Sequence, residues 1–447
     1  MRLSLTYIAL IALALTLASC GSRKGLGALD LNHIYQKDGT LVRPRIRIYN
    51  TDQFNSKVYF SFSSEEILYS RLRADEPFEA SVDVQIFVYE DFSLGSIIDT
   101  FSTSISESTM ELTPHTIYGE VDVAIHEMRP LEQYVLLIRF NDRNRKLYFD
   151  AIQLLERSNP LSRQNYLVLD ADSNVVFGDH ILLNRDYRVL ANTDDKQLHV
   201  RYYNREFNPG LPPFAKPGEG NFDHTADSTF RVSNGERFQV HEQGFYHFQT
   251  DPSVRDGFTL YNFYDTYPLV TDKKHLIYPM RYLTSNLEYD GINLNDEDSA
   301  KYAIDKFWLT HASNEERARD QIEEYYERVE AANVYFTSYK EGWMTDRGVL
   351  YVIYGPPQKI YRTLNTEIWV YGEETSSLNF TFAFDRMVNP YTGNDYSLRR
   401  SSEYRYGWGM AIDAWRHGRI YDVSDIKKAQ DERDQQLRQT AAPHIWY

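Results

Sequence analysis

The chain has 447 residues, of which 64 are acidic and 48 are basic, so its formal net charge is −16. An acidic body is a poor partner for nucleic acid and for anionic lipid surfaces, because all of them are negatively charged. The length predicts two to four domains, each with its own core. Tyrosine is abundant, with 35 copies, and suits half-buried sheets and exposed binding faces alike.

Residues 1–19 have the pattern of an export signal. Arg2 precedes an apolar stretch over 5–17, which is too short for a membrane span, since a span needs about 20 residues. The stretch ends in Leu17-Ala18-Ser19-Cys20-Gly21, which resembles the lipobox of bacterial lipoproteins. This resemblance implies cleavage before Cys20 and acylation of its thiol. The alternative is an ordinary cleaved signal followed by a chance cysteine.

Cys20 is also the only cysteine of the chain. No disulfide can form within one copy and no cysteine-based metal site exists. Acylation would remove a thiol that is a liability in an oxidising compartment. Residues 20–39 then form a lipidated tether, and their extended length keeps the folded body close to the membrane. The lipid bilayer is therefore the first expected partner.

Residues 40–157 alternate between apolar and polar side chains in short segments separated by polar turns. Such a pattern, without a helical period between segments, predicts a β-sandwich of immunoglobulin-like type. The segments lie at 42–49, 58–62, 82–89, 97–105, 118–125, 134–140 and 146–152.

Residues 158–291 form a second β-rich, sandwich-like domain in this interpretation. Ser158-Asn159-Pro160-Leu161 marks the joint, and the segments that follow are less regular and more aromatic. The stretch 208–223 is rich in proline and glycine, which predicts an irregular loop.

Residues 292–423 have a different pattern, typical of a small α+β domain. A helix is expected after 295–299, and Ser313 and Glu316 have capping-box spacing for a second helix. Along that second helix an apolar stripe recurs at intervals of three and four, which predicts core packing. Strands are expected at 367–371 and 379–384, and a charged helix and tail at 424–447. The stripe consists of Ala318, Ile322, Tyr325, Val329, Ala332 and Phe336.

A dense motif follows the second helix. Gly342 stands where a helix C-cap favours a left-handed residue, and Trp343 can fold back on the last turn. Thr345 and Asp346 are typical of a tight turn, after which Gly348 would lead into a strand over 349–354. Gly355, Pro356 and Pro357 would end that strand, because proline lacks the donor that a central strand needs.

The run Gly342-Trp343-Met344-Thr345-Asp346, followed by Arg347-Gly348 and by Gly355-Pro356-Pro357, resembles the GWxTD domain of Bacteroidota envelope proteins. The resemblance covers about 292–423. Similar proteins combine this domain with a lipoprotein signal and β-sandwich modules. The family implies an envelope location and no settled biochemical activity, so the motif residues are interpreted as structural.

Chemical signatures are sparse. His241, Glu242 and His247 are the nearest approach to a metal cluster, but their spacing is wrong for a zinc helix, so neither metal nor cofactor is expected. No nucleophile elbow, Walker loop or dinucleotide fingerprint occurs. Asp346 and Arg347 favour a salt bridge at the turn over a catalytic or recognition pair. Four tryptophans favour core packing, with a surface aromatic patch beside Arg405 and Arg416 as the alternative; they are Trp343, Trp369, Trp408 and Trp415.

The sequence therefore predicts a non-enzymatic envelope lipoprotein. Its expected role is that of a scaffold or accessory subunit of an outer-membrane complex, for instance in protein export or assembly, with envelope proteins as partners. A glycan- or protein-binding module is the alternative, and a hydrolase of envelope polymers is a third. The basic segment 22–24 departs from the acidic stretch of surface-exported lipoproteins, so a periplasm-facing position in the outer membrane is expected.

Overall fold

The computed structural model describes residues 30–36, 42–93, 95–126, 133–216, 222–292, 297–312, 314–372 and 380–421. The expected export signal, Cys20, most of the tether and the C-terminal helix at 424–447 lie outside these residues. Within them, strands predominate and form five antiparallel sheets, and most of the helices lie in the C-terminal third. The predicted fold class, mostly β with a C-terminal α+β region, is confirmed.

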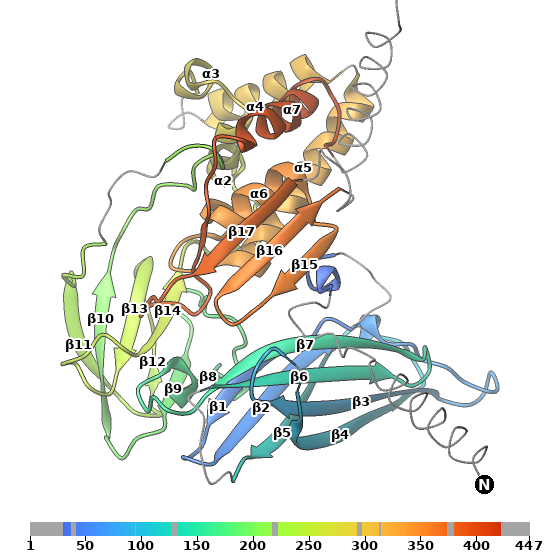
Figure 1. Ribbon diagram of the computed structural model, residues 1–447, viewed down its shortest axis with the longest axis vertical. Helices are drawn as coiled ribbons and strands as arrows, with labels where there is room; N and C mark the ends of the chain where they lie inside the picture. Colours follow the sequence, from blue (N-terminus) through green and yellow to red (C-terminus); the bar gives the residue numbers. More distant parts are fainter. Residues whose placement is uncertain are drawn as a thin grey trace, which may run out of the picture.

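The N-terminal module is a β-sandwich of seven strands in two sheets, as predicted. One sheet has the order β1-β2-β5 and the other the order β4-β3-β6-β7, which leaves β1 and β7 as edge strands (Figure 1). Alternate residues of the strands meet in one core that includes Val58, Val84 and Ile138. The strands are β1 (Arg45–Asn50), β2 (Asn55–Ser63), β3 (Phe78–Tyr89), β4 (Ile97–Thr109), β5 (Thr116–Ala124), β6 (Gln133–Asp142) and β7 (Leu147–Glu156).

The second module also pairs two sheets, ordered β11-β10-β13-β14 and β12-β9-β8, over a shared core. A short 3₁₀ helix, η4 (Arg163–Asn165), lies in the chain between the last strand of the first module and the first strand of the second. The strands are β8 (Tyr166–Leu169), β9 (Tyr187–Ala191), β10 (Gln197–Tyr203), β11 (Ser228–Ser233), β12 (Arg237–Phe238), β13 (Gly244–Gln249) and β14 (Phe258–Asn262).

The end of the second segment differs from the prediction. Residues after β14 form the short helices α2 (Lys273–Ile277), η5 (Tyr278–Tyr282) and α3 (Asn286–Asp290). Asp272 caps the first and Ser285 the third through a capping box. Their apolar side chains enter the C-terminal core. Aromatic content suggested strands here, but the capping residues determine the local structure.

The C-terminal domain packs helices on a sheet of order β15-β16-β17-β18. The predicted stripe of the long helix is core: five of its six residues are buried and Ile322 is partly buried. Asn314 caps this helix by accepting a hydrogen bond from the Arg317 amide, whereas the predicted capping residue Ser313 lies outside the described residues. The elements are α4 (Glu297–His311), α5 (Glu315–Phe336), η6 (Gly342–Met344), α6 (Asp346–Tyr354), β15 (Lys359–Arg362), β16 (Thr366–Tyr371), β17 (Phe380–Arg386), β18 (Tyr396–Leu398) and α7 (Tyr404–Arg416).

The predicted strand at 349–354 is wrong, because these residues belong to helix α6. The run is apolar and rich in β-branched residues, which favours a strand by propensity. Every residue from Arg347 to Tyr354 is buried, however, so the segment shows no period that distinguishes a buried helix from a buried strand. Tertiary packing and the N-cap at Thr345 stabilise the helical conformation of this segment.

The three modules contact one another through segments distant in sequence (Figure 1). Residues 30–36, which the prediction assigned to the tether, form η2 (Asn32–Ile34) and pack Leu31 and Tyr35 into the C-terminal core. Arg47 of β1 forms an ion pair with Asp179 of the second module at 2.9 Å. Of the helices in the described part of the chain, none is both long and apolar enough to cross a membrane.

Candidate functional site

The motif at 342–348 is the N-terminus of helix α6 and not a helix C-cap followed by a strand. Thr345 is the N-cap, since its Oγ1 accepts a hydrogen bond from the Gly348 amide at 3.0 Å. The same hydroxyl donates to the Gly342 carbonyl at 2.8 Å. One threonine thereby links η6 to α6 and satisfies an amide that a helix start leaves free.

Two glycines of the motif allow close backbone approach. A Cβ at Gly342 would lie 2.0 Å from the Ala332 carbonyl oxygen of α5, and a Cβ at Gly348 would lie 1.9 Å from the Gly342 carbonyl oxygen. Gly342 does not adopt the predicted left-handed conformation. Gly355 does, with φ of 79°, and it forms the C-cap of α6. The Gly355-Pro356-Pro357 segment therefore ends a helix and leads into β15.

Trp343 is the central residue of η6 and is buried, with a contact to α5. Its amide donates to Asn333 Oδ1 on α5 at 3.2 Å, and its indole Nε1 donates to Glu341 Oε2 at 2.7 Å. Burial raises the pKa of the Glu341 carboxyl to about 7, although the indole hydrogen bond acts in the opposite direction. The tryptophan thus fixes the motif to the long helix.

Asp346 and Arg347 do not pair with each other, contrary to the predicted salt bridge. The Asp346 carboxylate binds Arg400 at 2.5 Å and accepts the Leu398 amide of β18 at 2.9 Å. Arg347 has different partners, and its Nη2 donates to the Asn394 carbonyl at 3.1 Å. Both charged residues of the motif are therefore used to attach α6 to neighbouring segments.

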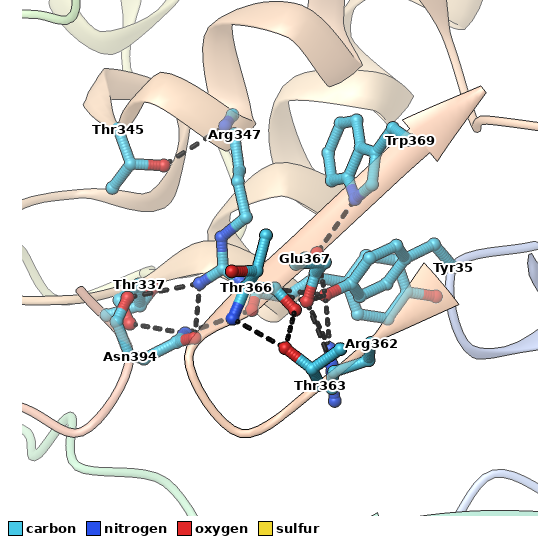
Figure 2. Close-up of polar contacts among 12 residues, drawn as sticks. Tyr35, Thr337, Thr345, Arg347, Arg362, Thr363, Thr366, Glu367, Trp369 and Asn394 are labelled. Carbon is cyan, nitrogen blue, oxygen red and sulfur yellow. Dashed lines mark hydrogen bonds and ion pairs between the residues drawn. The ribbon is translucent and has the colours of Figure 1, made fainter. Parts of the chain in front are cut away.

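Arg347 belongs to a buried ionic cluster centred on Glu367 of β16 (Figure 2). Glu367 is fully buried. Its carboxylate accepts from Arg362 Nε at 2.9 Å, from the Trp369 indole at 2.7 Å and from the Tyr35 hydroxyl at 3.1 Å. Arg347 Nη1 lies 3.5 Å from the same carboxylate. We call these residues, Tyr35, Arg347, Arg362, Glu367 and Trp369, the Glu367 cluster.

Two guanidinium groups share the single carboxylate of the Glu367 cluster and keep it ionised. Burial alone would raise the pKa of Glu367, but the nearby Arg362 and Arg347 guanidinium groups outweigh it and lower that pKa to about 2. The guanidinium carbon of Arg347 also lies 3.9 Å from the centre of the Tyr396 ring, a favourable cation–π contact. No buried polar side-chain atom of the Glu367 cluster lacks a hydrogen-bond partner among the described residues. This arrangement is typical of a cluster that stabilises the fold.

Sequence reasoning singled out Arg347 but missed Tyr35, Arg362 and Glu367. A signal was present, because Glu367 and Trp369 are two apart and so share one face of a strand. A carboxylate on the buried face of a strand requires a cationic partner. The tertiary fold determines which arginines supply that positive charge. It also brings Tyr35, which lies 332 residues before Glu367, to the same carboxylate.

The other predicted groups fall into the core or onto the surface. All four tryptophans are buried, with Trp408 at 7% the most exposed, so the surface aromatic patch is not formed. Arg405 lies over Phe214, and Arg416 pairs with Glu288.

The histidines of the nearest metal-like cluster have ordinary partners. His247 Nδ1 bonds the Thr259 hydroxyl at 2.8 Å, and His241 Nδ1 lies 2.8 Å from Asn184 Oδ1. Burial lowers the pKa of His247 to about 4. In the described ranges no three His, Cys, Asp or Glu side chains are grouped so that they could hold a metal ion.

Solved structures share only weak similarity with the chain. A Bacteroides uniformis β-glucuronidase is 13% identical with a TM-score of 0.17, over 26% of this chain and 13% of that one. A glycosyl hydrolase family 2 member from Bacteroides cellulosilyticus is 6% identical with a TM-score of 0.18, over 30% and 15%. The BSP domain of a biofilm associated protein is 10% identical with a TM-score of 0.17, over 54% and 55%.

The chain thus spans only 13–15% of the length of these two glycosidases. No curated protein matches the chain. The model of the GWxTD domain matches residues 244–417. This range includes η6, α6 and the Glu367 cluster, and begins at β13 of the second module. Residues 244–417 of this chain are a GWxTD domain.

Proposed function

We propose that the protein is a membrane-anchored envelope lipoprotein that acts without catalysis, as a scaffold or accessory subunit of an outer-membrane complex. Cys20, preceded by an export signal, supplies the anchor. The folded body supplies rigid surfaces for partner proteins. The periplasmic leaflet of the outer membrane is the proposed position, because residues 22–24 are basic.

The observation that supports a structural role is the use of the polar residues in the GWxTD motif. Thr345 caps α6, Asp346 binds Arg400 and the Leu398 amide, and Arg347 joins the Glu367 cluster. Each is engaged with another part of the same chain. A catalytic group, in contrast, needs a hydrogen-bonding position directed at substrate.

The contacts between modules also favour a scaffold. Tyr351 of α6 donates to the Tyr35 carbonyl at 2.9 Å, so the segment before the first sandwich is fixed in the C-terminal domain. Arg163 Nη1 donates to the Tyr391 carbonyl at 3.0 Å, and Arg400 Nη1 to the Pro212 carbonyl at 2.7 Å. These contacts hold three modules in one arrangement, as a scaffold requires.

The alternative of a glycan-binding second module has less support. Its aromatic residues at the boundary with the C-terminal domain, such as Phe207, Phe222 and Phe245, stack on one another in a buried cluster. Aromatic platforms for sugars must instead present a free ring face. The packing therefore favours module attachment.

Crosslinking in intact cells, followed by purification of a C-terminally tagged chain from membranes, tests the proposal. The wild type should carry acyl chains and co-purify with at least one envelope protein at a fixed ratio. Cys20→Ser should lose the acyl chains and the membrane fraction but keep its fold. A wild-type chain that is acylated but migrates alone would contradict the scaffold role, and one that lacks acyl chains would contradict the anchor. Digestion by protease added to intact cells would contradict the periplasmic position.

A further inference from the structure

A cavity of about 740 Å³ lies where the N-terminal sandwich meets the C-terminal domain. Edge strands β1 and β7 form one wall. The other walls come from η2, from η4 and from the loops after β15 and before β18. Its volume is within the range of about 300–1,000 Å³ that is usual for small-ligand sites.

The lining of this cavity is strongly basic although the protein is acidic. Seven arginine side chains contribute to it, whereas only two acidic residues do, Glu156 and Asp179. The whole chain, in contrast, has 16 more acidic than basic residues. Three of the arginines come from the start of the first sandwich, namely Arg43, Arg45 and Arg47.

Five of the seven arginines have a carboxylate partner. Arg163 and Arg47 both pair with Asp179, and Arg386 lies 3.7 Å from Glu156. On the opposite wall, Arg347 and Arg362 share Glu367, which lies behind them in the core. These ion pairs fix the cavity wall, but their five guanidinium groups share only three carboxylates, so the wall keeps an excess of positive charge.

Arg43 and Arg45 are the exceptions. Within the described residues neither forms an ion pair, and Arg43 Nη2 is buried without a hydrogen-bond partner. The nearby Glu66 carboxylate accepts the backbone amide of Arg43 at 2.9 Å. Arg47 Nε is a second buried donor without a partner. A buried donor left unsatisfied costs about 1–3 kcal/mol, so these groups require an acceptor.

The spacing of these arginines indicates which chemical groups suit them as an acceptor. Residues two apart project from the same side of an extended chain, about 7 Å from each other, so the like charges of Arg43, Arg45 and Arg47 are neighbours. A guanidinium group matches the two oxygens of a carboxylate or phosphate group. An oxyanion between the arginines would satisfy the free donors and relieve the repulsion.

We propose that this cavity is a binding site for a small organic anion that carries phosphate or carboxylate groups. Arg43 and Arg45 bind the anion from the sandwich side, and the wall that contains Arg347 and Arg362 faces it from the C-terminal domain. The ligand therefore stabilises the junction of two modules. This inference goes beyond the scaffold proposal and does not depend on the membrane anchor.

Titration calorimetry tests the site on the full chain, purified from membranes in a non-ionic detergent. Inorganic pyrophosphate and citrate serve as probes for phosphate and carboxylate chemistry. Each probe is titrated into the wild type and into Arg43→Gln with Arg45→Gln. Arg73→Gln is the control for a surface arginine, because it removes one positive charge from an exposed loop of the same sandwich, away from the cavity.

Saturable binding of at least one probe, with one site per chain, is the expected result. The double variant should bind at least tenfold more weakly, a change of about 1.4 kcal/mol, whereas Arg73→Gln should bind like the wild type. Binding of pyrophosphate alone assigns a phosphorylated ligand, and binding of citrate alone a carboxylated one. Absence of saturable binding to both probes, or an equal loss in Arg73→Gln, would overturn the proposal. A thermal unfolding midpoint of the double variant at or above that of the wild type shows that its loss of binding is not a loss of folding.

Discussion

The two walls of the arginine-lined cavity use the same side chain in opposite ways. On the C-terminal wall, Arg347 and Arg362 share the buried carboxylate of Glu367, and a tyrosine and a tryptophan complete its hydrogen bonds. On the sandwich wall, Arg43 and Arg45 have no such partner within the described residues, and a buried Nη2 of Arg43 is unsatisfied. The first arrangement is complete and contributes to stability, whereas the second is incomplete and suits a ligand.

The largest expected effect is the loss of the carboxylate from the complete wall. Glu367→Gln leaves two buried guanidinium groups without a counter-charge, so the free energy of unfolding should fall by about 3–5 kcal/mol. Urea denaturation measures it. The control Glu120→Gln removes a carboxylate from an exposed pair with Lys57 and should cost no more than about 1 kcal/mol. Similar losses in both variants would show that the cluster contributes no more than a surface pair.

A second variant tests whether close packing positions the complete wall. Gly348→Ala places a methyl group 1.9 Å from the Gly342 carbonyl oxygen, which forces α6 and η6 apart at a cost of about 1–3 kcal/mol. Gly409→Ala in α7 is the matched control, because nothing lies within 4 Å of its Cβ position. That change should stabilise the helix by up to about 1 kcal/mol. Opposite signs are expected in thermal unfolding, and equal signs would contradict the close approach.

Glu341 is intermediate between the complete and the incomplete wall. Its carboxyl accepts one hydrogen bond, from the Trp343 indole, and has no ion pair in the described structure. Its folded pKa is about 7, against about 4.5 when unfolded. The folded state thus binds the proton more tightly, and stability should fall as pH rises from about 4.5 to about 7. The two pKa values differ by about 2.5, so the effect is at most about 3 kcal/mol. Unfolding measured across this range should lose that component in Glu341→Gln, and an unchanged pH profile would contradict it.

The sequence predicted the elements that have a regular exposed face. Strand β3 of the first sandwich alternates buried and more exposed residues over most of its length, and the stripe of α5 recurs with a helical period, so both were found. The burial of the tryptophans also followed from their size and apolar character. In each case the signal is local and is repeated several times.

The prediction was wrong where burial removes the period. Helix α6 is buried on all sides from Arg347 onwards, and its β-branched run was interpreted as a strand. Two local signals were available: Thr345 before Asp346 is typical of a helix N-cap, and Gly355 is typical of a helix end. They were interpreted as a turn and as a strand end instead.

The Glu367 cluster and the cavity were beyond sequence reasoning for another reason. Tyr35, Arg347 and Glu367 come from three distant segments, and no local pattern indicates that they meet. The alternation of arginines at 43–47 was visible, but only the fold shows that these residues line a cavity opposite a second basic wall.

The thermal unfolding midpoints of three proteins, with and without pyrophosphate or citrate, test the contrast between the two walls most directly. Thr345→Ala removes the cap of α6 and should lower stability by about 1 kcal/mol while the anion still raises its midpoint. Without anion, Arg43→Gln with Arg45→Gln should unfold at or above the wild-type midpoint, because the repulsion between the two guanidinium groups is removed, and the anion should no longer raise that midpoint. A double variant that still responds to the anion like the wild type, or a Thr345→Ala protein that no longer responds, would contradict the separation of a structural wall from a ligand-binding one.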